Sequence, residues 1–157
     1  MTRQTTTCPR MLQYKPPRVA LSLLLGAAAV QAFLPQSTAG LGPLPAAGAV
    51  LGLLGCAVML RAWWLFKRAE TAICPAARTT ALVTDDVFRL TRNPMYLGMV
   101  LMLLGIALGS GGLAFYLAAL VFFLIIDSVF CPFEEQKLGS AFGGKYSEYA
   151  AQVRRWL

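Results

Sequence analysis

The 157-residue chain contains no histidine, few charged residues and no closely spaced pair of cysteines. The absence of histidine excludes imidazole metal sites, Ser/His/Asp triads and histidine general bases. The four cysteines, Cys8, Cys56, Cys74 and Cys131, lack C-x-x-C spacing, so they imply neither a disulfide framework nor a zinc site. Charged residues make up 13% of the chain against 57% hydrophobic residues, which predicts an integral membrane protein.

The charge that is present is mostly positive, with 14 Lys and Arg against 7 Asp and Glu. We attribute this excess to retention of positive charge at the cytosolic membrane face and expect no nucleic-acid binding. Four basic residues lie before residue 19, none in the turns at 35–45 and 109–112, six at 61–92 and four at the C-terminus. This distribution predicts four spans with both termini in the cytosol.

Four apolar runs are the expected transmembrane spans. They cover residues 19–34, 44–60, 94–109 and 113–130. The first run could also be a signal peptide, because small residues follow it at 37–40, but it is long for a signal sequence and further spans follow. Between the second and third runs, residues 80–84 could form a short extended piece.

The third span has a well-marked start. Asn93 is a favourable N-cap and Pro94 a favourable first helical residue, so a helix should run from here to about Gly109. Such a helix reaches about 22–24 Å, which is short of the bilayer core of about 30 Å. The fourth span should therefore pack closely against it, and should end at Cys131-Pro132.

After Pro132, apolar residues recur every three or four positions with basic residues between them. This pattern predicts an amphipathic helix in the membrane interface, broken at Gly143-Gly144. The fold class is then an all-α integral membrane protein with about four transmembrane helices and this interfacial C-terminal helix. Its parts are a cytosolic tail (1–18), a first transmembrane hairpin (19–64) and a catalytic part (65–157).

Two polar clusters flank the last two spans. The helix start at Asn93 and Pro94, beside Arg92, exposes unpaired backbone N–H groups and could hold a carboxylate or a phosphate. The alternative is an ordinary turn into the membrane, with Arg92 reaching the headgroups. Glu134 and Glu135 favour the interpretation as a binding site, because acidic side chains at a membrane face are stabilised by a cation or by hydroxyl donors. An anion site beside a carboxylate site suits S-adenosylmethionine.

These residues resemble the integral membrane methyltransferases that include isoprenylcysteine carboxyl methyltransferases and phospholipid N-methyltransferases, and in particular their small bacterial relatives. The shared features lie within residues 82–157: a Leu-Val-Thr start, the Arg-Asn-Pro-x-Tyr-x-Gly turn, a Glu-Glu pair and a Phe-Gly-x-x-Tyr-x-x-Tyr tail ending in Val-Arg-Arg. The resemblance implies an S-adenosylmethionine-dependent enzyme in a bacterial inner membrane. The implied cofactor contacts are Leu82, Val83, Phe88, Asn93, Pro94, Met95, Tyr96 and Glu134, with Arg92 and Glu135 as neighbours.

The chain departs from this family at three positions. Eukaryotic members have histidine in place of Asn93, whose amide can still donate a hydrogen bond but cannot carry charge. Phe130 replaces a substrate-contacting arginine, so recognition of a prenylcysteine carboxylate is in doubt. Asp86 replaces a glycine and is a residue that tolerates positive φ better than most.

Asp127 is the candidate catalytic residue, because an acid at that depth of a span is often functional. It could equally be an interfacial acid paired with a loop arginine. Tyr96, Tyr146 and Tyr149 could face the positively charged sulfur of the cofactor, or could be simple interface anchors.

We therefore expect methyl transfer from S-adenosylmethionine to a lipophilic or membrane-associated acceptor bearing a thiol, carboxylate or amine. The partners implied are this small molecule and the lipid bilayer, and no metal is expected. A nicotinamide-dependent membrane reductase and a non-catalytic membrane interaction module are the alternatives.

Overall fold

The structure, a computed structural model, describes residues 15–33, 44–70 and 80–157. Its elements in chain order are α1 (Pro16–Gln31), α2 (Pro45–Arg68), the 3-10 helix η2 (Asp86–Arg89), α3 (Pro94–Ser110), α4 (Leu113–Ile125), the π-helical turn η3 (Ile126–Phe130), α5 (Cys131–Phe142) and α6 (Gly144–Gln152). Over these ranges there is no strand, which confirms the predicted all-helical class; residues 80–85 are irregular. Cys8, Cys74 and most of the turn predicted at 35–45 lie outside the described residues.

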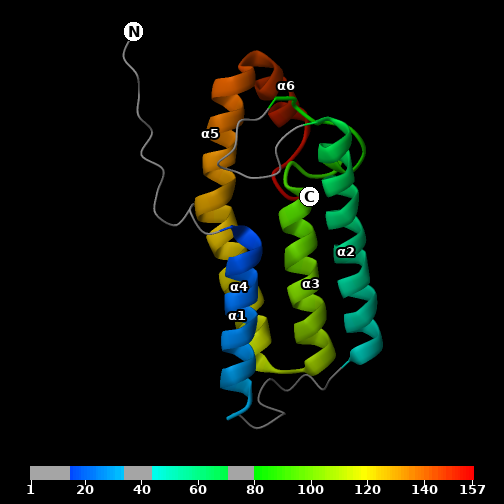
Figure 1. The fold of residues 1–157 in the computed structure, drawn as a ribbon, viewed down its shortest axis with the longest axis vertical. Coiled ribbons are helices and arrows are strands. Elements are labelled where there is room, and N and C mark those ends of the chain that lie inside the picture. Colours follow the sequence, from blue (N-terminus) through cyan, green and yellow to red (C-terminus); the bar gives the residue numbers. More distant parts are fainter. Residues whose placement is uncertain (1–14, 34–43, 71–79) are drawn as a thin grey trace.

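The helices α1 to α4 run along the long axis of the molecule, and successive helices run in opposite directions (Figure 1). In space α2 contacts α3, α3 contacts α4, and α4 contacts α1. At one end, α5 prolongs α4 beyond the other helices, α6 crosses above the bundle, and the C-terminus returns to the start of α3 (Figure 1). The two polar clusters that flank the last two predicted spans lie at this end.

Glycines allow α2 and α3 to come into backbone contact. A Cβ added at Gly55 would lie 2.6 Å from the carbonyl oxygen of Gly98, and a Cβ at Gly98 would lie 2.6 Å from that of Gly55. Gly48 and Gly105 face each other in the same way, with corresponding distances of 2.5 and 2.7 Å. Small residues at a helix interface let backbones approach closely in a membrane, where burial of apolar surface drives helix association only weakly. The most extensive helix contact is therefore that of α3 with α2, and not with the fourth span.

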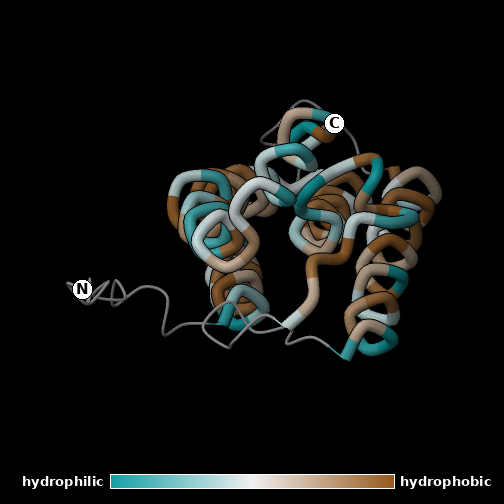
Figure 2. Tube along the Cα trace, turned by 90° about the horizontal axis from the view of Figure 1, so that it is seen from above, coloured by the Kyte–Doolittle hydropathy of each residue, from teal (hydrophilic) through white to brown (hydrophobic). Residues whose placement is uncertain are grey.

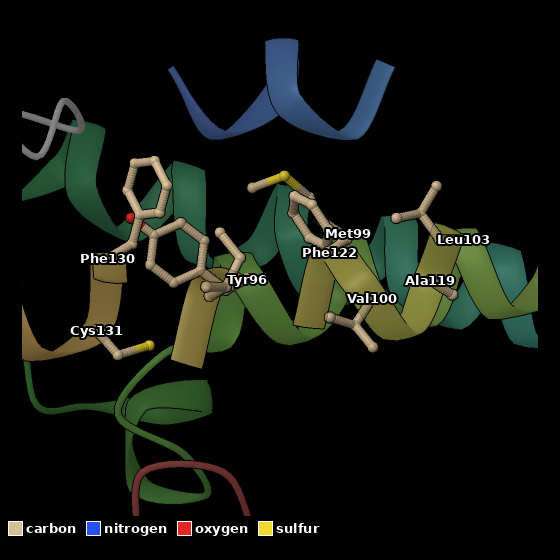
Figure 3. Close-up of a cluster of buried hydrophobic side chains, with 9 residues drawn as sticks. Tyr96, Met99, Val100, Leu103, Ala119, Phe122, Phe130 and Cys131 are labelled. Atoms are coloured by element: carbon tan, nitrogen blue, oxygen red, sulfur yellow. The ribbon is translucent and has the colours of Figure 1, made fainter. Parts of the chain in front are cut away.

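The opposite side of α3 packs against the helix that begins at Leu113. Tyr96, Met99 and Leu103 meet the fully buried Phe122 and Phe130 in this core cluster, with Tyr96 at the end nearest the polar segments (Figure 3). The rings of Tyr96 and Phe130 are 6.4 Å apart in an edge arrangement. This packing holds the first turn of α3 in a defined position relative to η3 and α5.

The fourth predicted span does not end at Cys131-Pro132, and that prediction is wrong. One continuous helix of 30 residues runs from Leu113 to Phe142. A proline inside an α-helix lacks an N–H donor and clashes with the carbonyl of the preceding turn. The π-helical turn η3 lies just before it, with the Cys131 N–H bonded to the Ile126 oxygen, and this wider turn makes room for Pro132. The predicted amphipathic segment therefore starts as the extension of a span, while its helical structure and the break after Phe142 agree with the sequence.

Within the described residues, two helices are long and apolar enough to cross a bilayer, α2 and the continuous helix Leu113–Phe142. The helices α1 and α3 have only 16 and 17 residues. Hydrophobic residues occur along all the helices of the bundle (Figure 2). Several of them are exposed on its outside, such as Leu53 at 71% and Leu25 at 62%. Such a surface is suited to lipid rather than to water.

Candidate functional site

A cavity of about 320 Å³ lies at the end of the bundle where α3 begins. All ten residues that the sequence suggested as cofactor contacts line it. They are Leu82, Val83, Phe88, Arg92, Asn93, Pro94, Met95, Tyr96, Glu134 and Glu135. The neighbouring segments 82–88 and 92–96 and the distant pair Glu134-Glu135 therefore meet around one space.

The start of α3 forms one wall of the cavity. Pro94 is the first helical residue and Asn93 occupies the N-cap position, as predicted. The predicted capping hydrogen bond, however, is not made: the buried Asn93 amide turns away from the helix, and its Nδ2 donates to the backbone oxygen of Arg155 at 3.2 Å. A tertiary contact explains this difference, because the C-terminal segment of the chain passes beside this turn and accepts the hydrogen bond.

This C-terminal segment, residues 153–156, is tied to the turn before α3 by three hydrogen bonds. The Thr91 hydroxyl donates to the Arg155 oxygen at 2.8 Å, and the Arg92 N–H donates to the Arg154 oxygen at 3.0 Å. The third is the bond from Asn93. Thr91 is almost fully buried, so these polar groups are satisfied by the C-terminal segment and not by water.

Glu135 lies opposite this turn and is held by two arginines. Arg155 binds it through both carboxylate oxygens, with Nε–Oε1 at 2.8 Å and Nη2–Oε2 at 2.7 Å. Arg92 Nη1 lies 3.3 Å from the same Oε1. A bidentate contact between arginine and carboxylate is strong and directional, and the partly buried carboxylates raise the pKa of the Arg155 guanidinium further. Glu135 is therefore largely committed to contacts within the protein.

Glu134 differs from its neighbour. The Tyr96 hydroxyl donates to Glu134 Oε1 at 2.6 Å, which joins α5 to the first turn of α3 across the cavity. Adjacent residues of a helix point about 100° apart, so the two carboxylates face different surroundings. Glu134 faces a tyrosine and the cavity, whereas Glu135 faces the arginines.

Asp127, the candidate catalytic residue, is not among the residues that line the cavity. Its Oδ1 accepts hydrogen bonds from Arg155 Nη1 at 3.1 Å and from Trp156 Nε1 at 2.9 Å. The carboxylate is thus engaged by the C-terminal segment on the outer side of η3. This geometry agrees with the alternative interpretation of an acid paired with an arginine.

Tyr146 and Tyr149 line the cavity from α6. Tyr146 accepts a hydrogen bond from Arg92 Nη1 at 3.3 Å, and Tyr149 donates to the Phe88 oxygen at 2.7 Å. Burial raises the pKa of both hydroxyls, that of Tyr149 to about 12. Both hydroxyls therefore stay protonated over the physiological range. The two side chains form the part of the cavity wall that α6 contributes.

Asp86 adopts the positive φ that the sequence suggested it could tolerate, with a value of 60°. Its carboxylate accepts a hydrogen bond from Arg61 Nε at 2.9 Å, and this guanidinium holds the pKa of Asp86 below its usual range. The contact joins the end of α2 to η2, and η2 carries the buried Phe88 into the cavity wall.

Sequence reasoning missed several lining residues. They are Lys15, Pro16 and Pro17 at the start of α1, Phe66 at the end of α2, Ala81, Met99, and Lys137 and Leu138 on α5. Four of them, Pro16, Pro17, Phe66 and Met99, belong to helices that the sequence marks only as membrane-spanning, so no local pattern singles them out. Only the spacing of Lys137 and Leu138 after the Glu-Glu pair could have suggested that they lie one turn along the same helix face.

The groups around the cavity fit S-adenosylmethionine. One side is apolar, from residues such as Leu82, Val83 and Phe88, and suits an adenine ring. The other side combines the α3 N-terminus, Arg92 and two carboxylates, which together can hold a carboxylate and an ammonium group. Arg92 Nε is buried and has no hydrogen-bond partner among the described residues. In these residues there is also no group of three or more Cys, Asp or Glu arranged to hold a metal ion.

Comparison with known proteins identifies the family. Residues 44–145, well over half of the chain, match the phospholipid methyltransferase family. No curated protein and no solved structure matches the chain. This family is related to the isoprenylcysteine carboxyl methyltransferases, and its members use S-adenosylmethionine. The chain therefore belongs to the phospholipid methyltransferase family and is an S-adenosylmethionine-dependent membrane methyltransferase.

Proposed function

We propose that the cavity at the start of α3 binds S-adenosylmethionine and that the enzyme methylates a lipophilic acceptor drawn from the bilayer at the cytosolic face. The observation that carries this proposal is the meeting of the turn at 92–96, the pair Glu134-Glu135 and the apolar segment at 82–88 around one cavity. The family match favours this function over a nicotinamide-dependent reductase or a non-catalytic module.

Each side of the cavity has a binding role in this proposal. Arg92 and the backbone N–H groups at the start of α3 hold the cofactor carboxylate, where the partial positive charge of a helix N-terminus adds to that of the guanidinium. Glu134 holds the ammonium group or the ribose hydroxyls. The tyrosine ring faces at Tyr96, Tyr146 and Tyr149 suit a positively charged sulfur, at about 0.5–2 kcal/mol for each well-placed ring.

When bound, S-adenosylmethionine supplies a methyl group on a positively charged sulfur, which an acceptor lone pair takes as the carbon–sulfur bond breaks and its electron pair stays on sulfur. The protein needs to hold the acceptor in line with that methyl group and to exclude water. Such positioning can lower the barrier by up to about 7–11 kcal/mol. A thiolate, a carboxylate or a neutral amine needs no dedicated base, which is in keeping with a site built without histidine.

Two features bear on the nature of the acceptor. A second depression, of about 200 Å³, is lined by Met59, Leu60, Trp63 and Met95, and Met95 also lines the main cavity. An apolar depression beside the cavity suits an acyl or prenyl chain. Phe130, where relatives have arginine, is fully buried against Tyr96, so this position offers no charge to a prenylcysteine carboxylate. Among the three acceptor groups, this observation disfavours a carboxylate.

The proposed topology has four spans with both ends in the cytosol, and it divides the chain into the tail 1–18, the hairpin 19–64 and the catalytic part 65–157. The alternating directions of α1 to α4 support it (Figure 1). Labelling of intact cells with an impermeant thiol reagent tests it. Cys8 and Cys74 should be protected and a Ser110→Cys variant labelled. Labelling of Cys74 with protection of the variant would refute four spans.

The function is tested with purified protein in detergent, methyl-labelled S-adenosylmethionine and a lipid extract. Label should pass into the organic phase, and a Glu134→Gln variant assayed at the same donor concentration should transfer much less. Calorimetric titration with S-adenosylmethionine and with a nicotinamide dinucleotide separates the alternatives. Binding of the dinucleotide alone would support the reductase, and binding of neither would support the non-catalytic module.

A further inference from the structure

We infer that Arg155 is a positioning residue that joins the two sides of the cofactor cavity, although it does not line the cavity itself. The inference rests on the proposed cofactor site. Arg155 belongs to the Val-Arg-Arg ending of the sequence resemblance, but it lies beyond the matched residues 44–145 and is not among the cofactor contacts that the sequence suggested. Its contacts reach both cavity walls at once.

The backbone of Arg155 holds one wall. Its carbonyl oxygen accepts hydrogen bonds from Thr91 Oγ1 at 2.8 Å and from Asn93 Nδ2 at 3.2 Å. Both donors stand directly before the first helical residue of α3, where the cavity is lined by Arg92, Asn93 and Pro94. The position of this carbonyl therefore fixes the direction in which the α3 N-terminus and its arginine face.

The side chain of Arg155 holds the other wall. Its guanidinium binds both oxygens of Glu135 on α5, and it also contacts Asp127 within η3. The two acids lie on either side of Pro132, in the part of the long helix where the π-helical turn interrupts regular α-helical bonding. A planar guanidinium with several donors in a fixed arrangement can hold both acids in one geometry, which a lysine ammonium cannot do.

Glu135 links this arrangement to the cavity. Its Oε1 lies 2.8 Å from Arg155 Nε and 3.3 Å from Arg92 Nη1, and Arg92 in turn reaches the hydroxyl of Tyr146. Arg155 therefore sets the position of Glu135, and Glu135 sets that of Arg92. Glu134, the next residue of the same helix turn, is oriented towards Tyr96 by the same constraint.

The first test needs no ligand and uses hydrogen–deuterium exchange of the detergent-purified protein. The Arg92 N–H is bonded to the Arg154 oxygen, so its protection reports on the attachment of the C-terminal segment. Arg155→Gln should speed exchange in residues 91–97 and 134–138 by about tenfold, whereas Arg154→Gln, which changes an exposed side chain and keeps the backbone carbonyl, should not. Unchanged exchange in Arg155→Gln would overturn the inference.

The second test is calorimetric titration with S-adenosylmethionine. Arg155→Gln should raise the Kd about fivefold, Arg155→Lys should fall between it and the wild type, and Arg154→Gln should match the wild type. If Arg155 acts through Glu135, the double variant Arg155→Gln/Glu135→Gln should bind no more weakly than the weaker single variant. If the two single-variant effects on Kd multiply in the double variant, or if Arg155→Gln leaves the Kd unchanged, Arg155 only stabilises the fold and does not position the site.

The two tests also keep this inference apart from the proposed function. A wild-type protein that does not bind S-adenosylmethionine would refute the proposed cofactor site. The exchange data would still decide whether Arg155 joins the turn before α3 to α5. If Arg155→Gln fails to fold, the charge-conserving Arg155→Lys carries both measurements, and wild-type exchange and affinity in that variant would overturn the inference.

Discussion

The body of α3 and its first turn are held in position by different kinds of contact. Along most of its length, α3 lies against α2 through the facing glycines Gly98 and Gly55, with backbone atoms in contact and no ion pair. Its first turn is instead surrounded by hydrogen bonds and ion pairs from η2, α5, α6 and the C-terminal segment. A backbone contact tolerates almost no added atom, whereas a polar cluster tolerates conservative exchanges. Close backbone packing thus lies within the bundle, and the proposed cofactor site lies at its end.

The largest expected effect comes from the glycine contact. Gly55→Leu should prevent folded enzyme from accumulating, because even a Cβ at this position would lie 2.6 Å from a backbone oxygen of α3. Overpacking of this kind typically costs about 1–3 kcal/mol and can cost more when the clash is with backbone. Thermal unfolding and size-exclusion profiles measure the result. Gly52→Leu is the control, since a Cβ at Gly52 meets no atom within 4 Å, and equal behaviour of the two variants would contradict the close contact.

The next effect concerns the two neighbouring acids. Glu134→Gln should weaken S-adenosylmethionine binding by about 1.5–3 kcal/mol, which is at least tenfold in Kd, because a shielded carboxylate loses its charge-assisted hydrogen bonds. Glu135→Gln should weaken binding less and should lower thermal stability, because it removes the bidentate contact with Arg155. Binding isotherms and unfolding curves of both variants in one detergent decide this. A greater loss of affinity in Glu135→Gln would remove Glu134 from the proposed cofactor contact.

Asn93 tests the boundary between the two regions. Asn93→His should be tolerated, because histidine can still offer a donor to the Arg155 carbonyl and relatives carry histidine here. Asn93→Leu should cost about 1–2 kcal/mol in cofactor affinity, since it leaves buried polar groups unpaired beside the site. Calorimetry compares the variants, with thermal unfolding as a check on folding. Wild-type affinity in the leucine variant would show that Asn93 serves only the bundle.

The smallest expected effect is a pH dependence of stability that comes from Tyr149, which lines the cavity. The pKa of Tyr149 is raised to about 12 from its ordinary value near 10, because the hydroxyl is buried. The protonated form is favoured in the folded state, so this contribution to stability is complete below pH 10 and is lost as the pH rises towards 12. Tyrosinate absorbance of wild type minus Tyr149→Phe should give a single step near pH 12. A step near pH 10 would mean that this hydroxyl is exposed.

Local sequence patterns determined much of the fold. The pair Asn93-Pro94 marked the start of α3, the glycine-rich turn at 109–112 marked its end, and Gly143-Gly144 marked the break between α5 and α6. These predictions depend on backbone preferences that act within a few residues, such as the fixed φ of proline and the positive φ open to glycine. The motif residues predicted to share one site also line one cavity. Their role in cofactor binding stays a proposal until the affinities are measured.

Only the tertiary structure decided the features that depend on distant partners. Pro132 was expected to end a helix, but the π-helical turn η3 lets the helix continue through it. Asn93 was expected to cap α3, but its side chain donates a hydrogen bond to the C-terminal segment. Asp127 was a candidate for catalysis, but Arg155 and Trp156 engage it outside the cavity. Pro132 is accommodated by the backbone of the turn just before it, whereas Asn93 and Asp127 each take the polar partner which folding brings nearest. That partner can be tens of residues away, whereas composition and helix starts depend on neighbours along the chain.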